Sequence, residues 1–214
     1  MRRVPLLVAS IVSAALGAAS TLPAAAAQGA GAAGSRVVID NPHVRIFRTT
    51  AGSLSGVDHG PAVVVALEES PGIKPGSAVW VDDAAAPISI GGMKGEIVIV
   101  QPRRSSPAPP AATGSSPGDG QFIGMSFTPI FENDRVSTIR ARMEVGAREG
   151  FHTHGSDTVV VHLSGGEIED TADGKTVVNR WKRGDVEFEG LGTSHSARNV
   201  AGAVDVVLVV LKRQ

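Results

Sequence analysis

The stretch GFHTHGSDTVVVHLSGG, residues 150–166, places two histidines two positions apart, directly before an apolar run. The run at 158–163 is rich in valine and is followed by a glycine pair, which is typical of a buried β-strand. Side chains two apart on an extended strand point to the same side, so His152 and His154 can bind one metal ion together. Imidazole is a common ligand of transition metals, and the remaining ligands must come from elsewhere in the chain.

Short valine-rich runs separated by glycine and proline recur on both sides of this stretch, and none of them after residue 27 has a helical period. Many short strands at such spacing predict an all-β barrel or sandwich. The chain has no cysteine, which excludes thiolate metal sites and thiol nucleophiles. We expect strands at 44–49, 62–67, 78–81, 96–101, 135–144, 158–163, 166–170, 175–181, 185–189 and 205–212.

Residues 1–27 begin with Arg2 and Arg3 and continue with an apolar stretch and an alanine run, which predicts a secretory signal peptide. We therefore expect a secreted or periplasmic protein with no stable membrane span after cleavage. The alternative is a retained anchor, although the apolar run is short for a span of about 20 residues. Cleavage would move the formal net charge from −1 to about −3. Nothing in the sequence suggests the basic face that nucleic-acid binding needs.

A segment dense in proline, serine and glycine, residues 102–120, predicts a linker between a first half, 28–101, and a second half, 121–214. The two halves have similar strand sequences in the same order, which favours an internal duplication. The first half has no paired histidines at the matching place, so we expect no metal site there and treat His43 and His59 as surface residues. The matching pairs are NPHVRIFRTT with NDRVSTIRAR, PAVVVALEE with DTVVVHLSG, and EIVIVQPRR with DVVLVVLKR.

A second stretch, GDVEFEGLGTSHSARN at 184–199, carries His195 after a glycine-rich turn. Together with Gly146, five residues and the His-x-His pair, it resembles the two sequence motifs of the cupin superfamily at full spacing, with glycine replacing the usual proline at position 190. The resemblance implies a cupin-type β-barrel, also called a double-stranded β-helix or jelly roll, for residues 121–214. It extends to the first half only as a degenerate cupin-like half, and it implies His152, His154 and His195 as metal ligands.

One departure from the family pattern concerns the usual fourth ligand, a glutamate, because Thr158 occupies its position. Asp157 lies next to it, but strand alternation aims that side chain at the opposite face unless a bulge re-aims it. We therefore expect a three-histidine centre, with Asp157 as the alternative fourth ligand. Three neutral imidazoles leave a divalent ion its full charge, which favours an anionic chelating substrate and leaves coordination positions open.

Several other side chains near the motifs can be interpreted in two ways. His162 shares a face with Thr158 but lies some 13 Å of strand beyond it, too far for the same metal. It is either a core histidine hydrogen-bonded to a neighbour or an acid or base at the pocket floor. Arg148 and Arg198, like Arg142, either meet an anionic substrate or lie at solvated strand edges. Acid or base candidates are Glu149, Asp157 and His162, and Met125 and Met143 are expected in the core.

The leading prediction is an exported enzyme with one divalent transition metal, acting on a small oxygen-rich or anionic molecule. A dioxygenase of the quercetinase or diketone-cleaving type suits iron or copper, whereas a lyase, isomerase or decarboxylase suits manganese, zinc or nickel. Outside the cytoplasm, affinity order alone favours copper and zinc. The alternative is a non-catalytic cupin module that binds a metal or a small ligand. The resemblance also implies a homodimer, although a single sequence does not show one.

Overall fold

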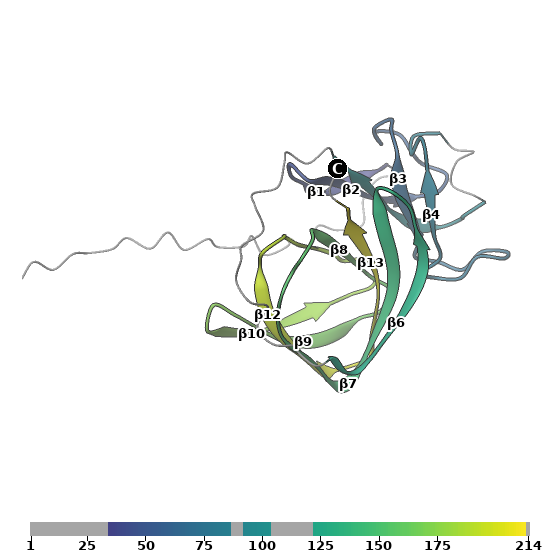
Figure 1. Cartoon of the computed structure of the whole chain (residues 1–214). Helices are drawn as coiled ribbons and strands as arrows, with labels where there is room; N and C mark the ends of the chain where they lie inside the picture. The colour runs from purple at the N-terminus through teal and green to yellow at the C-terminus, as the bar shows by residue number, and fades with distance from the viewer. Residues whose placement is uncertain (1–33, 87–91, 104–121, 213–214) are drawn as a thin grey trace, which may run out of the picture. The chain divides into compact units, whose positions relative to one another are not determined.

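The computed structural model describes residues 34–86, 92–103 and 122–212 (Figure 1). All regular elements in these ranges are β-strands, so the all-β prediction is confirmed. No helix in the described part of the chain is long and apolar enough to cross a membrane. The predicted signal peptide at 1–27 and nearly all of the predicted linker lie outside the described residues.

The first half forms one antiparallel sheet of five strands in the order β1-β2-β5-β3-β4. Its central strands are almost continuously apolar and fully buried, as expected for strands that are covered on both faces. The strand at 36–40 was not predicted. The strands are β1 (Arg36–Asp40), β2 (Val44–Thr50), β3 (Ala62–Ala66), β4 (Ala78–Val81) and β5 (Glu96–Pro102).

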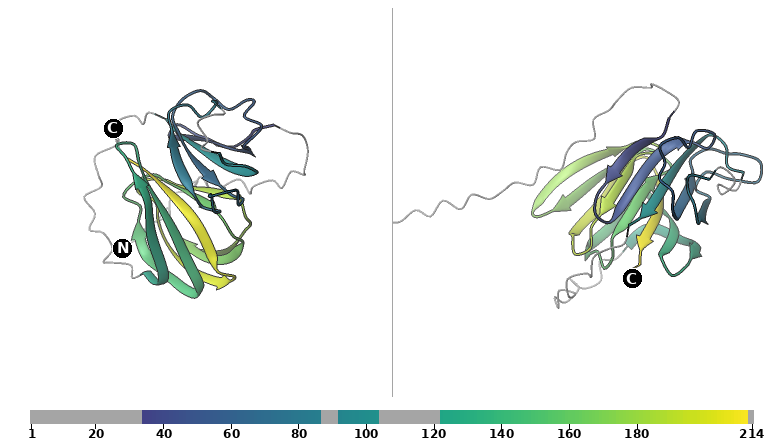
Figure 2. Two further views of the ribbon diagram at one scale, coloured as in Figure 1. Left: turned by 90° about the vertical axis from the view of Figure 1, so that its right-hand side faces the viewer. Right: turned by 90° about the horizontal axis from the view of Figure 1, so that it is seen from above.

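The second half forms an eight-stranded antiparallel sheet in the order β10-β9-β12-β7-β13-β8-β11, with β6 paired to the other side of β7. The sheet curls into a half-barrel, and the views in Figure 2 show β6, β7 and β13 side by side. The strands are β6 (Phe122–Glu132), β7 (Val136–Thr153), β8 (Thr158–His162), β9 (Gly166–Ala172), β10 (Lys175–Trp181), β11 (Val186–Glu189), β12 (Ser194–Ala201) and β13 (Val204–Leu211).

The 18-residue strand β7 belongs to both arms of the curled sheet. Its residues 136–143 pair with β13, and its residues 148–153 pair with β12. Gly146, at the change of partner, has a φ of 83°, a left-handed value that favours glycine. On the neighbouring strand Gly124 has a φ of 71°, and a Cβ there would lie 3.0 Å from Ala147 Cβ. The two glycines allow the bend that carries the end of β7 across the half-barrel.

The two sheets share a core made largely of valine side chains. One face of β2, β3 and β5 packs against one face of β7, β8 and β13, so each half covers the other. The opposite face of the first sheet is closed by loop residues such as Val57 and Met93, whereas the opposite face of the second sheet lines a pocket. Fully buried members of the shared core include Val44, Ile46, Val63, Val65, Val98, Val100, Val136, Val159, Val161, Val207 and Val209.

The strand pairing of the first half repeats part of the second. The order β1-β2-β5-β3-β4 corresponds to the pairings β6-β7, β7-β13, β13-β8 and β8-β11. The turns also match, since Asn41 Oδ1 accepts from the Val44 N–H and Asn133 Oδ1 from the Val136 N–H, both at 2.9 Å. Within the described residues, the first half has no counterpart of β9, β10 and β12. An origin by duplication stays a prediction.

We expect Val161→Ala to lower the free energy of unfolding by about 2 kcal/mol, because it deletes two methyl groups from a fully buried position in the shared core. The matched control is Val177→Ala on β10, where the residue is 54% exposed and the change should stay within about 0.5 kcal/mol. Urea unfolding measures both. Equal effects of the two substitutions would contradict the shared core.

Candidate metal centre

Three histidines from two neighbouring strands meet at one side of the pocket. His152 lies near the end of β7, His154 directly follows that strand, and His195 lies on β12 in register with His152. One ring nitrogen from each lies within 4.8 Å of the others, and the Nε2 atoms of His154 and His195 are 3.1 Å apart. The structure thus brings together the three histidines that the sequence motifs singled out, in a group that fits a single metal ion.

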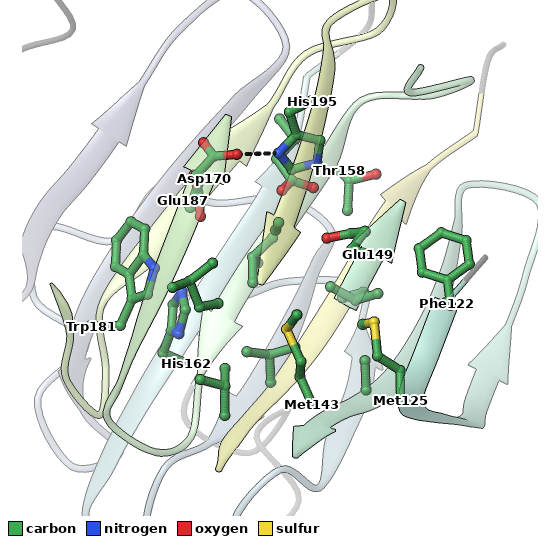
Figure 3. A pocket seen from close by; sticks show the side chains of 18 of the residues that line it. Phe122, Met125, Met143, Glu149, Thr158, His162, Asp170, Trp181, Glu187 and His195 are labelled. Carbon is green, nitrogen blue, oxygen red and sulfur yellow. Dashed lines mark hydrogen bonds and ion pairs between the residues drawn. The ribbon is translucent and has the colours of Figure 1, made fainter. Parts of the chain in front are cut away.

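The ring nitrogens that face away from the group have partners of their own. His195 Nδ1 lies 3.0 Å from Asp170 Oδ1 (Figure 3), and His152 Nδ1 lies 3.0 Å from the Gly150 carbonyl oxygen. His154 Nδ1 is 3.6 Å from Glu189 Oε2. Acceptors at Nδ1 of His152 and His195 orient these rings with Nε2 toward the group, as is usual for metal-binding histidines in proteins. The donor set therefore fits a divalent transition metal.

A β-bulge in β7 places Glu149 on the same face as the histidines. His195 pairs with His152 but Ala197 pairs with Glu149, so Gly150 and Phe151 lie opposite one residue of β12. The extra residue reverses the alternation of the strand. As a result Glu149 Oε1 lies 3.5 Å from His152 Nε2. A carboxylate therefore lies beside the histidine group, on the strand that carries the histidine pair.

Three further carboxyls surround the histidines. Glu189 on β11 lies opposite Thr158 in the strand register, and Glu187 lies opposite Val160. Asp170 on β9 pairs with the small residue Ala197, whose other neighbour is Glu149. The sequence analysis predicted both strands but assigned no role to these carboxyls. The alternation Glu-Phe-Glu at 187–189 was the available signal, since it puts both glutamates on one face.

Burial in the pocket raises the pKa values of the glutamates, because the charged form loses its hydration. The pKa of Glu187 rises to about 7, with Asp170 adding to the effect. The pKa of Glu189 rises to about 8, with a further contribution from Glu187. Burial also raises the pKa of Glu149 above its usual range.

The pKa values of His154 and His195 shift in opposite directions. Burial, together with the neighbouring imidazoles, lowers the pKa of His154 to about 4. Burial also acts to lower the pKa of His195, but the hydrogen bond to Asp170 and the charges of Glu149 and Glu189 outweigh it and raise the pKa to about 9. Carboxyls thus gather around the imidazoles at this end of the pocket, an environment that a bound divalent cation would stabilise.

Asp157, the alternative fourth ligand, points away from the histidines. Its Oδ1 accepts a hydrogen bond of 2.8 Å from the Leu191 N–H, and its Oδ2 lies 2.8 Å from His43 Nδ1. The bulge lies at 150–151, so it re-aims Glu149 and not Asp157. Thr158 does line the pocket, and its side chain is nearly buried.

The arginines proposed for an anionic substrate do not reach the histidines. Arg148 is exposed and is not part of the pocket lining. Arg198 is also exposed and pairs with Glu169 at 3.1 Å. Arg142 does line the pocket, but it pairs with Glu144 at 2.6 Å. Carboxyls, not guanidinium groups, therefore set the charge at the histidine end.

The pocket has a volume of about 240 Å³ and a largely apolar wall. Its wall comes from all the strands from β6 to β13, and most of its polar side chains belong to two groups. One is the histidine group, and the other is formed by His162 on β8 and Trp181 on β10 (Figure 3). The apolar lining consists of Phe122, Met125, Phe127, Ala141, Met143, Val160, Ile168, Ala197, Val204, Val206, Leu208 and Val210.

The chain was compared with protein families, curated proteins and solved structures. No family model and no curated protein matches it. Among solved structures it is similar to a cupin domain from Bordetella pertussis Tohama I, at 25% identity over 43% of this chain and 97% of that chain, with a TM-score of 0.40. It is also similar to KdgF from a Halomonas species, at 19% identity over 45% and 87% of the two chains, with a TM-score of 0.37.

A further similar structure is that of a predicted oxalate decarboxylase from Thermotoga maritima, at 25% identity over 41% of this chain and 79% of that chain, with a TM-score of 0.34. Within the present chain, the two histidine motifs lie on neighbouring strands of a curled antiparallel sheet, and their three histidines converge in its pocket. Residues 122–211 thus have a cupin-type fold, and their histidine arrangement resembles that of the cupin superfamily.

We expect His195→Ala to weaken zinc binding by more than about 100-fold, because it removes one of three converging ring nitrogens. Isothermal titration of metal-free protein with zinc and elemental analysis after dialysis measure the effect. His59→Ala is the matched control, because His59 is exposed and pairs only with Asp83. Zinc binding of equal strength in both variants would contradict the site.

We expect Asp170→Asn to weaken zinc binding by about 10- to 100-fold, because an amide orients the His195 ring less firmly than a carboxylate does. The control is Glu169→Gln on the same strand, where the carboxylate pairs with Arg198 outside the pocket. The same titration compares the two variants. If Glu169→Gln costs as much as Asp170→Asn, the loss reflects overall charge and not ring orientation.

Proposed function

We propose that the protein is a metal-dependent, dioxygenase-like enzyme that holds one divalent transition metal at His152, His154 and His195. The observation that carries the proposal is the convergence of three ring nitrogens in a pocket wall, with the Glu149 carboxylate 3.5 Å from one of them. Three protein nitrogens leave coordination positions open, which is the catalytic pattern; structural zinc sites are normally closed by four protein ligands.

The charge of the site supports a substrate that arrives neutral. The expectation of an anionic substrate came from three neutral imidazoles and a full +2 charge on the metal. The described pocket adds four carboxyls near the histidines, from β7, β9 and β11. A bound divalent cation favours the deprotonated form of these carboxyls, whose negative charge then offsets that of the metal and disfavours an approaching anion. An enol or a phenol, as found in diketones and flavonols, is the substrate class that this environment supports.

Glu149 has the position of the general base. Its Oε1 accepts the proton of the substrate hydroxyl, and the electron pair of the broken O–H bond stays on the substrate oxygen. The metal, when bound, acts as a Lewis acid for that oxygen, and iron or copper adds redox chemistry with O2. The apolar wall of β8 and β13 excludes water and holds the body of the substrate.

The alternative function is a non-catalytic module that binds a metal and a small apolar ligand. The continuous apolar wall favours this candidate, because it provides binding without chemistry. Export by residues 1–27 and assembly as a homodimer belong to the proposal on the strength of the sequence alone. The two functions differ in turnover. The enzyme needs a carboxylate near the metal as a base, whereas the binding module needs it at most for binding.

We expect Glu149→Gln to lower turnover by about 10²- to 10⁴-fold while zinc affinity changes by only a few fold, because the amide cannot accept the proton. Oxygen uptake is measured with 2,4-pentanedione and quercetin, on full-length protein loaded in turn with iron and copper. The control is Glu144→Gln, an exposed carboxylate on the same strand.

The outcomes separate the candidate functions. Oxygen uptake by the wild-type protein that falls in Glu149→Gln supports the enzyme and the base. No uptake with either metal, combined with measurable binding of quercetin, favours the binding module. Loss of metal from Glu149→Gln would make Glu149 a fourth ligand instead of the base.

A further inference from the structure

The second polar place in the pocket centres on His162. Its side chain is 1% exposed, and it faces the pocket from β8 together with Thr158 and Val160. Neither ring nitrogen has a hydrogen-bond partner among the residues that the structure describes. The sequence-based alternative of a core histidine bonded to a neighbour therefore fails for these residues. A buried polar group without a partner costs folding free energy, so a reason for keeping it is needed.

The ring of His162 is fixed in place. It stacks on Trp181 of β10, with ring centroids 4.4 Å apart and planes at 17°. Burial lowers the pKa of His162 to about 4, so the ring is neutral near pH 7 and offers one N–H donor and one bare nitrogen acceptor. Asn179, two residues before Trp181, also lines the pocket. A neutral, oriented and unpartnered imidazole is suited to a hydroxyl group, which can donate or accept.

The distance between the two polar places follows from the strand register. Successive inward pairs of β8 and β13 run from Thr158 with Val210, through an apolar pair, to His162 with Val206. Four residues of strand span about 13 Å. Glu189, which contacts His154, lies opposite Thr158, so the histidine group is at the first pair. The pocket thus has a metal end, a middle that is apolar on β8 and β13 and carries Glu187 on β11, and a neutral hydrogen-bonding end.

We propose that His162 selects the substrate by hydrogen-bonding a hydroxyl group on the end of the molecule that is remote from the metal. The substrate class is then a neutral molecule with an apolar, ring-containing body and a hydroxyl at each end. This inference rests on the proposed function only in taking the pocket as the substrate site. The stacked Trp181 ring and the apolar middle contact the body, and His162 discriminates by the hydroxyl.

The test compares p-cresol with toluene, which has the same shape but no hydroxyl. The chain has two tryptophans, so a Trp80→Phe background leaves Trp181 as the fluorescent reporter beside His162. We expect p-cresol to bind about 10-fold more tightly than toluene, because the analogue without the hydroxyl leaves His162 unpaired. The anion 4-methylbenzoate should bind no more tightly than toluene. Equal binding of p-cresol and toluene, or tightest binding of the anion, would overturn the inference.

The deciding variant is His162→Phe, which keeps an aromatic ring against Trp181 and removes both nitrogens. We expect the preference for p-cresol over toluene to fall below about 2-fold, with toluene affinity unchanged. The melting temperature should stay equal or rise, since a buried unpaired polar group is lost. A lower melting temperature with equal losses for both probes would show a merely structural role and overturn the inference.

The two proposals fail separately. Binding is measured on full-length protein with zinc and again after treatment with EDTA, and the preference for p-cresol is expected in both states. Absence of oxygen uptake would count against the enzyme but leaves the p-cresol result standing. Loss of the preference in both states overturns the role of His162, whatever the metal centre does.

Discussion

The geometry of the site depends on one strand that changes partner along one of its edges. β7 pairs with β13 over its first part and with β12 over its second, and the left-handed Gly146 lies at the change. Beyond it, the bulge at 150–151 brings Glu149 onto the face of His152. A substitution that straightened either irregularity would move side chains to the wrong face, since the side-chain period of a strand is two. Bend and bulge together create the candidate centre.

The electrostatics of the pocket follow from this geometry. Three imidazoles and four carboxyls share a space of low polarity, and buried charges are stable only when they are paired or bind a metal. The opposite pKa shifts of His154 and His195 express this competition for protons. His162 lies outside the competition, because no carboxyl is its partner and burial alone acts on it. One pocket therefore contains a charged end and a neutral polar end.

Local patterns in the sequence predicted the histidines and the strands other than β1, β6 and β12, and non-local pairing determined the rest. The valine runs and the His-x-His pair have a period of two that needs no knowledge of partners. β6 was not predicted, since Pro129 and exposed phenylalanines obscure its pattern. The continuation of β7 was missed because Gly146 reads as a break. Regular strand alternation would place Glu149 on the face opposite to His152. Only the register with β12 reveals the bulge that brings both onto one face.

The first half contributes to the site without carrying any of it. Its valine face packs behind β8, the strand that carries His162, and side chains from one half lie close against glycines of the other. A Cβ at Gly184 would lie 2.5 Å from Arg48 Cζ, and one at Gly76 would lie 2.5 Å from Leu163 Cδ1. Gly184 precedes β11, so the motif glycine that turns the chain toward Glu187 also admits the side chain of the other half. The described first half thus supports the pocket without counterparts of β9, β10 and β12, because the shared core holds β8 and β11 in the register that the pocket needs.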